Sequence, residues 1–210
     1  MKSLLSIRDV YCASSLLDEG STSSPGLDLS TLRGRLTELS AELGHAQITL
    51  AVDLIAQIQR AEEPAAWIGA PSSLFYPPDV CDWDLDWSAL AVIRLDDAHR
   101  AARAADKLLR SGGFGLIVVD LVGFRHSSIP DPLLGRLLRL AKTHDSAAVF
   151  LTSSADRSPS VSPLVALRIR AQWRHVDPER LRAFYRVLKD KRRGPGHHFS
   201  EVYDGPMGLR

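Results

Sequence analysis

Residues 35–60 read RLTELSAELGHAQITLAVDLIAQIQR, and this stretch decides the fold. Its first part, Arg35–Ser40, is a short apolar strand by pattern, and Ile48–Ala61 has the apolar spacing of an amphipathic helix, with Leu50, Leu54 and Ile58 on one face. A strand that passes through a short loop into a helix is the opening of a parallel α/β unit. The stretch therefore predicts an α/β domain with a functional loop between its first strand and first helix.

That loop stands in the place of a phosphate-binding loop, whose pattern is G-x-x-x-x-G-K-[ST]. The glycines of the pattern let backbone N–H groups curl around phosphates, the lysine supplies a charge, and the hydroxyl residue binds magnesium. In register with the pattern, Ala41 and Ala46 replace the glycines, Gln47 replaces the lysine and Ile48 replaces the hydroxyl residue. We therefore expect a loop that has lost the chemistry of ATP hydrolysis.

Length and composition favour one domain. A chain of 210 residues that is 45% hydrophobic can bury one substantial core. We expect residues 1–33 to form an N-terminal segment with a short helix and a flexible loop, and residues 34–210 to form a single domain. No apolar run reaches the length of a membrane span, and the N-terminus does not resemble a signal peptide.

The two cysteines, Cys12 and Cys81, lack partners at metal-ligand spacing. This usage favours reduced thiols in a cytoplasmic protein, although a disulfide between the two stays open as an alternative. The histidines are scattered, and the pair His197-His198 would point to opposite faces of a strand, so we expect no metal site.

The rest of the chain alternates strands and helices and then changes to strands alone. The expected parallel strands are Ala65–Gly69, Ala89–Leu95, Leu116–Asp120 and Ala147–Leu151, and the expected helices are Asp97–Arg110, with Asp96 as N-cap, and Asp131–His144. Beyond a Ser/Pro-rich loop, Leu164–Arg174, Leu181–Lys189 and Phe199–Tyr203 have no helix between them. The sequence thus predicts a mainly parallel twisted sheet flanked by helices and extended by C-terminal antiparallel strands.

Several segments carry a resemblance to a known family. Residues 34–39, 108–120 and 187–192, in this order and spacing, look like the RecA-type recombinase core. The altered phosphate loop, the short N-terminus and the ending at 204–209 resemble more closely the ImuA family, often labelled SulA-like, over roughly residues 30–210.

The resemblance implies a RecA-like core and a role in damage-induced, error-prone translesion DNA synthesis. It implies as partners an ImuB-type inactive relative of Y-family polymerases and, through it, an error-prone polymerase, with RecA as a further candidate. The family label also suggests an inhibitor of cell division, an alternative that no residue of the sequence supports.

The catalytic positions of a RecA-like ATPase transfer poorly to this chain. The glutamate that polarises the attacking water after the second strand is matched by Pro71, which has no carboxylate. The Walker B acid is retained as Asp120, although a carboxylate at a strand end can also cap the next turn. We expect a pseudo-ATPase with no cofactor, and the alternative is a weak or regulated nucleotide-binding ATPase.

The C-terminal third is strongly basic. Residues 164–193 hold ten bases and three acids, a net charge of +7 in a chain whose total is +1. Basic side chains that alternate along a strand share one face, where guanidinium groups suit phosphate contacts and Trp173 and His175 are candidates for stacking on bases. The expected DNA contacts are Arg168, Arg170, Arg174, Arg182, Arg186, Lys189, Lys191, Arg192 and Arg193. The alternative is a solvated sheet face whose bases pair with acids elsewhere.

Overall fold

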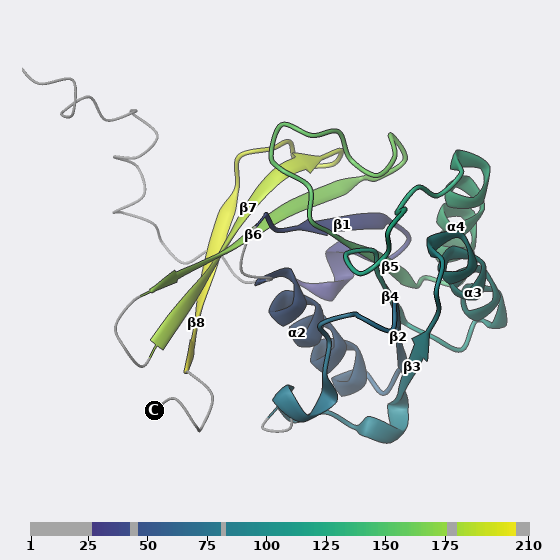
Figure 1. The fold of residues 1–210 in the computed structure, drawn as a ribbon, viewed down its shortest axis with the longest axis horizontal. Coiled ribbons are helices and arrows are strands. Elements are labelled where there is room, and N and C mark those ends of the chain that lie inside the picture. The colour runs from purple at the N-terminus through teal and green to yellow at the C-terminus, as the bar shows by residue number, and fades with distance from the viewer. Residues whose placement is uncertain (1–26, 43–45, 81–82, 176–179, 205–210) are drawn as a thin grey trace, which may run out of the picture.

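The computed structural model describes residues 27–42, 46–80, 83–175 and 180–204. Its strands form one eight-stranded sheet in the order β3-β2-β4-β5-β1-β6-β7-β8 (Figure 1). The expected N-terminal helix and loop, the two cysteines and the ending at 205–209 lie outside the described residues.

The first five strands of the sheet are parallel and alternate with helices. The strands are β1 (Leu36–Ser40), β2 (Ala65–Gly69), β3 (Leu90–Arg94), β4 (Leu116–Asp120) and β5 (Ala147–Thr152), and the helices are α2 (Ala46–Arg60), α3 (Ala98–Ser111) and α4 (Asp131–Thr143), with short 3-10 turns η2 (Leu29–Thr31), η3 (Pro77–Val80) and η4 (Trp87–Ala89). The predicted α/β core is confirmed, with boundaries that shift by up to two residues.

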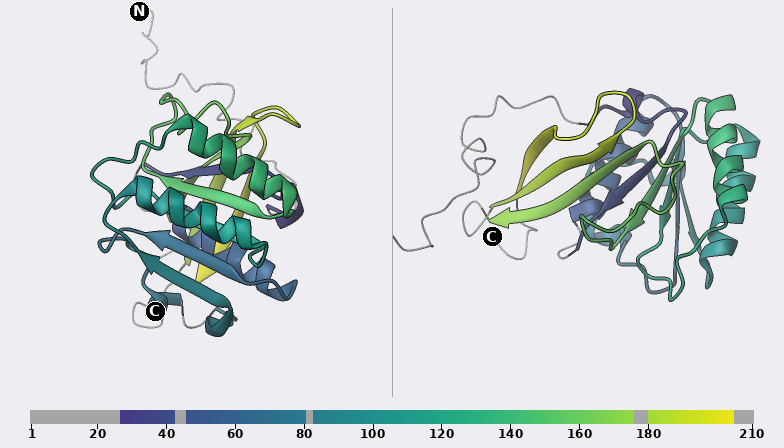
Figure 2. Two further views of the ribbon diagram at one scale, coloured as in Figure 1. Left: turned by 90° about the vertical axis from the view of Figure 1, so that its right-hand side faces the viewer. Right: turned by 90° about the horizontal axis from the view of Figure 1, so that it is seen from above.

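Helices cover both faces of the parallel strands. Helix α2 lies on one face, and α3 and α4 lie side by side on the other (Figures 1 and 2). Each face buries its own apolar cluster, one around Trp67 and Leu54 and the other around Phe150 and Leu137. Strands β2, β4 and β5 are buried along their whole length, as expected of parallel strands covered on both faces.

Two helix termini show how the local sequence sets the boundaries. Asp97 is the N-cap of helix α3, because its carboxylate accepts the N–H of Arg100 at 2.9 Å, so the prediction of Asp96 as N-cap was wrong by one residue. The C-cap of the same helix is Gly112, which has a φ of 70° and so adopts the left-handed conformation that favours glycine.

The segment before β1 packs onto the domain. Leu29 and Leu32 are buried in the α2-side cluster, and Gln57 of α2 accepts the backbone N–H of Leu29 at 3.1 Å. The described part of the N-terminal segment therefore belongs to the same core as the strands.

The C-terminal strands extend the sheet as predicted. Strand β6 (Leu167–His175) pairs with β1 in parallel, whereas β7 (Arg180–Asp190) and β8 (His198–Asp204) follow as antiparallel neighbours. We call these three strands the extension. Figure 2 shows them reaching away from the helical layers, with α2 near their base.

Candidate nucleotide loop and nucleic-acid interface

The β1–α2 loop lies at the carboxyl ends of the parallel strands. Ala41 directly follows β1, is buried, and donates its N–H to the carbonyl oxygen of Thr152 at 3.1 Å. Ala46 is the first residue of α2 and is fully buried, and residues 43–45 lie outside the described residues. The topology thus gives this loop the position that a phosphate-binding loop requires.

The residues that follow the loop are apolar or uncharged. Gln47 is fully buried, and neither atom of its side-chain amide has a hydrogen-bond partner among the described residues. Ile48 is half-buried and, with Leu74 and Val122, lines a hollow of about 210 Å³ beside Asp120. The position that would hold a magnesium-binding hydroxyl therefore presents an apolar side chain.

Asp120 at the end of β4 is engaged within the protein. It is 2% exposed, one carboxylate oxygen accepts the N–H of Val122 at 3.1 Å, and the other accepts the hydroxyl of Ser73. It thus caps the turn after β4, which is the structural alternative to a metal-binding role. Pro71 is exposed at the turn after β2, so it offers no group to this site.

The basic residues of the extension divide into two groups, and the first group is structural. Arg168 is 4% exposed and Arg170 7% exposed. Arg168 lies 3.3 Å from the carboxylate of Glu38 and donates to the carbonyl oxygens of Ser158 and Ala155. The prediction that Arg168 contacts DNA was wrong because this side chain holds the 153–163 loop against β1.

The second buried arginine has a similar role. Arg170 forms ion pairs with Glu42, at 2.9 Å, and with Asp156. Burial alone would lower the pKa of Arg170, but the hydrogen bonds to these two carboxylates raise it. Arg170 therefore joins the start of the nucleotide loop to the loop after β5, and the prediction that it contacts DNA was also wrong.

The second group lies on an open face of the extension. Arg174, Arg182 and Arg186 are exposed, and register places Arg174 opposite Arg182. On the same face, Arg186 is opposite His198, and Phe184 lies between the two pairs. We call these five residues, Arg174, Arg182, Phe184, Arg186 and His198, the arginine face.

Aromatic and cationic side chains are in contact on the arginine face. The guanidinium carbon of Arg174 lies 4.4 Å from the centroid of the Phe184 ring, and the rings of Phe184 and His198 are 5.7 Å apart. Arg186 pairs with Asp156 but keeps half of its side chain exposed. The face thus combines planar groups for stacking with positive charge for phosphates.

Trp173 does not belong to this face. It packs edge-on against Tyr203, with ring centroids 5.8 Å apart, on the side of the sheet that carries α2. Trp173 and Arg174 lie on different faces because neighbouring residues of a strand point to opposite faces, and the stacking of Trp173 on bases stays a prediction. The side chain of His175 lies outside the described residues. Phe184 was missed, although its even spacing with Arg182 and Arg186 was visible in the sequence.

The remaining bases lie at the other end of β7. Lys189 is half-buried, and burial together with the positive charge of Lys191 lowers its pKa. Lys191 donates to the carbonyl oxygen of Pro163 at 2.7 Å, whereas Arg192 and Arg193 are exposed in the turn between β7 and β8. These bases are therefore separate from the arginine face.

The strand order, the helices on both faces and the antiparallel C-terminal strands define a RecA-like α/β fold. No protein-family model matches the chain. The chain is similar to RecA proteins of Corynebacterium glutamicum (strain R), with 37% identity, and of Leifsonia xyli subsp. xyli, with 38% identity, in each case over 91 residues.

A RecA of Nocardioides sp. (strain ATCC BAA-499 / JS614) is 36% identical over 91 residues. The similar segment is 43% of this chain, and the chain spans about a quarter of the length of these relatives. The similarity supports a place in the RecA-like superfamily. Among the described residues, none of the helices combines the length and the apolar character needed to cross a lipid bilayer.

Proposed function

We propose that this chain is a non-catalytic RecA-like accessory protein of error-prone translesion DNA synthesis that binds DNA and an ImuB-type polymerase-like partner. The observation that carries the DNA-binding part is the arginine face, where exposed guanidinium groups flank Phe184. The role in translesion synthesis rests on the resemblance to the ImuA family, and no contact in the structure identifies the partner.

The loss of catalysis is supported by the nucleotide loop. Phosphoryl transfer depends on positioning and on charges that stabilise the transferred phosphate, and Gln47 and Ile48 supply neither the lysine charge nor the magnesium ligand. Asp120 is already satisfied by Ser73 and Val122. We expect no ATP hydrolysis, and calorimetry that gives micromolar binding of Mg-ATP would contradict this part of the proposal.

The DNA-binding part is tested by affinity across salt concentration. Phosphate contacts make the logarithm of the affinity fall with the logarithm of the salt concentration, and removing one basic side chain from a phosphate changes the slope by about one. Arg182→Gln should therefore weaken binding and flatten the slope, whereas the matched variant Arg139→Gln on α4 should leave both unchanged. Equal effects of the two substitutions would show that binding is non-specific.

A weak nucleotide-binding ATPase is the second candidate, because Gln47 is a buried amide without a partner among the described residues. Burying such a group without a hydrogen bond destabilises the fold, and a bound ligand that forms hydrogen bonds with the amide would remove this cost. Thermal stabilisation by Mg-ATP that is lost in Gln47→Leu would favour this candidate over the adaptor.

The proposed partner is tested by pull-down from DNA-damaged cells, in which we expect an ImuB-type protein to be captured. Capture of a tubulin-like division protein in its place would favour an inhibitor of cell division.

A further inference from the structure

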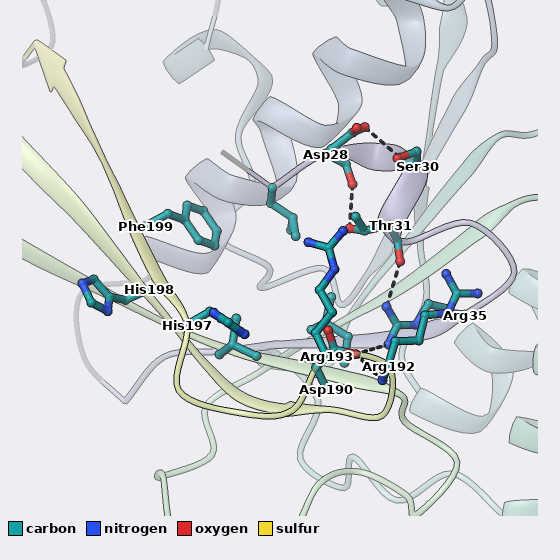
Figure 3. A pocket seen from close by; sticks show the side chains of 13 residues that line it. Asp28, Ser30, Thr31, Arg35, Asp190, Arg192, Arg193, His197, His198 and Phe199 are labelled. Atoms are coloured by element: carbon teal, nitrogen blue, oxygen red, sulfur yellow. Dashed lines mark hydrogen bonds and ion pairs between the residues drawn. The ribbon is translucent and has the colours of Figure 1, made fainter. Parts of the chain in front are cut away.

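A second basic feature is a cavity of about 430 Å³ between η2 and the β7–β8 turn, which borders the arginine face at His198 (Figure 3). Its volume lies within the range of small-ligand pockets, about 300–1,000 Å³. Most of the lining comes from two segments more than 150 residues apart in the sequence, 27–31 and 187–199, and Arg35 and Leu167 complete it.

The turn that borders this cavity is held firmly. Asp190 accepts the N–H of Arg192 at 2.8 Å and pairs with the buried guanidinium of Arg35. Gly194 and Gly196 have φ values of 82° and 103°, which the tight turn requires. Gly194 donates to the carbonyl oxygen of Asp190, and Gly196 donates to that of Val187. The turn therefore fixes the backbone from which Arg192 and Arg193 project.

The charges that line the cavity are unequally neutralised. Arg35 is compensated by Asp190, whereas Arg192 and Arg193 make no ion pair with any acid that the structure describes. His197 is exposed in the same lining. The other acid is Asp28, whose carboxylate accepts the N–H of Ser30 at 2.9 Å. An anion is therefore favoured beside the two arginines and disfavoured beside Asp28.

The rest of the wall is apolar and hydroxylic. Leu167, Val187 and Phe199 form part of the lining, and Ser30 and Thr31 contribute hydroxyl groups from η2. Apolar surface with a few polar groups beside it suits a ring system joined to an anionic group.

We propose that this cavity binds a phosphomonoester, as carried by a mononucleotide or by the phosphorylated end of a nucleic-acid strand. Arg192 and Arg193 hold the phosphate by charge-assisted hydrogen bonds, for which the planar guanidinium fork is suited. The base lies against the apolar wall, and Asp28 is placed to accept a hydrogen bond from a ribose hydroxyl. The site borders the arginine face at His198, but its two phosphate-binding arginines belong neither to that face nor to the β1–α2 loop.

The test uses the full chain and measures binding of inorganic phosphate, AMP and adenosine by calorimetry, with and without magnesium. We expect AMP to bind more tightly than phosphate, and adenosine to bind at least about tenfold more weakly than AMP, because it lacks the charged contacts. The double variant Arg192→Gln/Arg193→Gln should lose AMP binding, whereas Arg139→Gln should keep it. Circular dichroism checks that each variant is folded.

Two further arms separate the sources of the phosphate. If a 5′-phosphorylated oligothymidylate displaces AMP and its 5′-hydroxyl counterpart does not, the ligand is a strand end, and if neither displaces AMP, it is a free nucleotide. The proposal is overturned by AMP binding that needs magnesium and survives in the double variant, because such binding belongs to the β1–α2 loop. It is equally overturned if a glutamate-rich peptide binds and AMP does not. Variants of Arg182 should leave AMP binding unchanged, so failure here is distinct from failure of DNA binding.

Discussion

Arg168 and Arg170 on β6 are buried, so replacing either should affect the stability of the fold, unlike replacing an exposed base of the extension. Arg168 is buried against Glu38, which is itself fully buried and accepts hydrogen bonds from Thr152 and from the N–H of Val161. We expect Arg168→Ala to lower the free energy of unfolding by about 3–5 kcal/mol, because it leaves a buried carboxylate without its cation. Urea denaturation measures this.

The control for this prediction is an exposed arginine of the same extension. Arg182→Ala should change the free energy of unfolding by less than about 0.5 kcal/mol, since it alters no buried contact. Similar losses in the two variants would mean that Arg168 carries no special structural role.

Replacing Gln47, in contrast to Arg168, should increase the free energy of unfolding. Its amide is buried without a partner among the described residues, so Gln47→Leu should raise the free energy of unfolding by about 1 kcal/mol in urea denaturation.

Gln47→Lys alone should not yield ATP hydrolysis, because Ile48 still offers no magnesium ligand and Pro71 no carboxylate. A phosphate-release assay detects such activity, and its appearance would contradict the proposed loss of catalysis.

At the scale of single elements, the β7–β8 turn should respond to acid. Burial would raise the pKa of Asp190, but hydrogen bonds from Arg192 and the guanidinium of Arg35 lower it below its ordinary value. A lowered folded-state pKa adds stability above the ordinary value of 3.8, and that stability is lost as the pH falls through the folded-state pKa.

Asp190→Asn should therefore be less stable than the parent near neutral pH. It should also lose less stability as the pH falls below 3.8, the ordinary pKa of an aspartate. Thermal melts across this range measure the difference. The exposed variant Asp96→Asn serves as the control, and an unchanged pH profile in Asp190→Asn would refute the assignment.

The arginine face is also a property of an element, because its residues come together only by cross-strand register. Phe184→Ala should weaken single-stranded DNA binding by about 1–3 kcal/mol, the usual contribution of base stacking, and should affect duplex binding less. Fluorescence anisotropy with matched oligonucleotides measures both. Equal loss for the two DNA forms would show that Phe184 supports the sheet without contacting bases.

The sequence was sufficient for the elements but insufficient for the site. Buried parallel strands such as Leu116–Asp120 can be predicted from their continuous apolar runs. The end of α3 can be predicted from Gly112, because glycine readily adopts the left-handed conformation of a helix C-cap. Burial of Arg168 and Arg170 depends on acids from β1 and the 153–163 loop, which sequence spacing does not reveal. The alternating charge therefore predicts one exposed row of bases, although the first half of that row, Arg168 and Arg170, is buried.

The stability of the whole domain depends on the extension, although the extension lies at one edge of the sheet. Ile169, Ala183, Tyr185 and Phe199 belong to the same buried cluster as the apolar side of α2. We expect a fragment of residues 27–152 to lose cooperative unfolding, because α2 would then expose this surface to water. Circular dichroism melts and dye binding test this, and a sharp melt near that of the full chain would contradict it.

The central position of β1 has a consequence for the order of events during synthesis. This strand emerges early, yet both of its neighbours, β5 and β6, lie more than a hundred residues later in the chain. Until β5 and β6 are synthesised, the backbone N–H and C=O groups along both edges of β1 therefore have no strand to pair with, whereas β2, β3 and β4 can already pair with one another. A ribosome that stalls before Ala147 would release a chain with an open, aggregation-prone strand at its start.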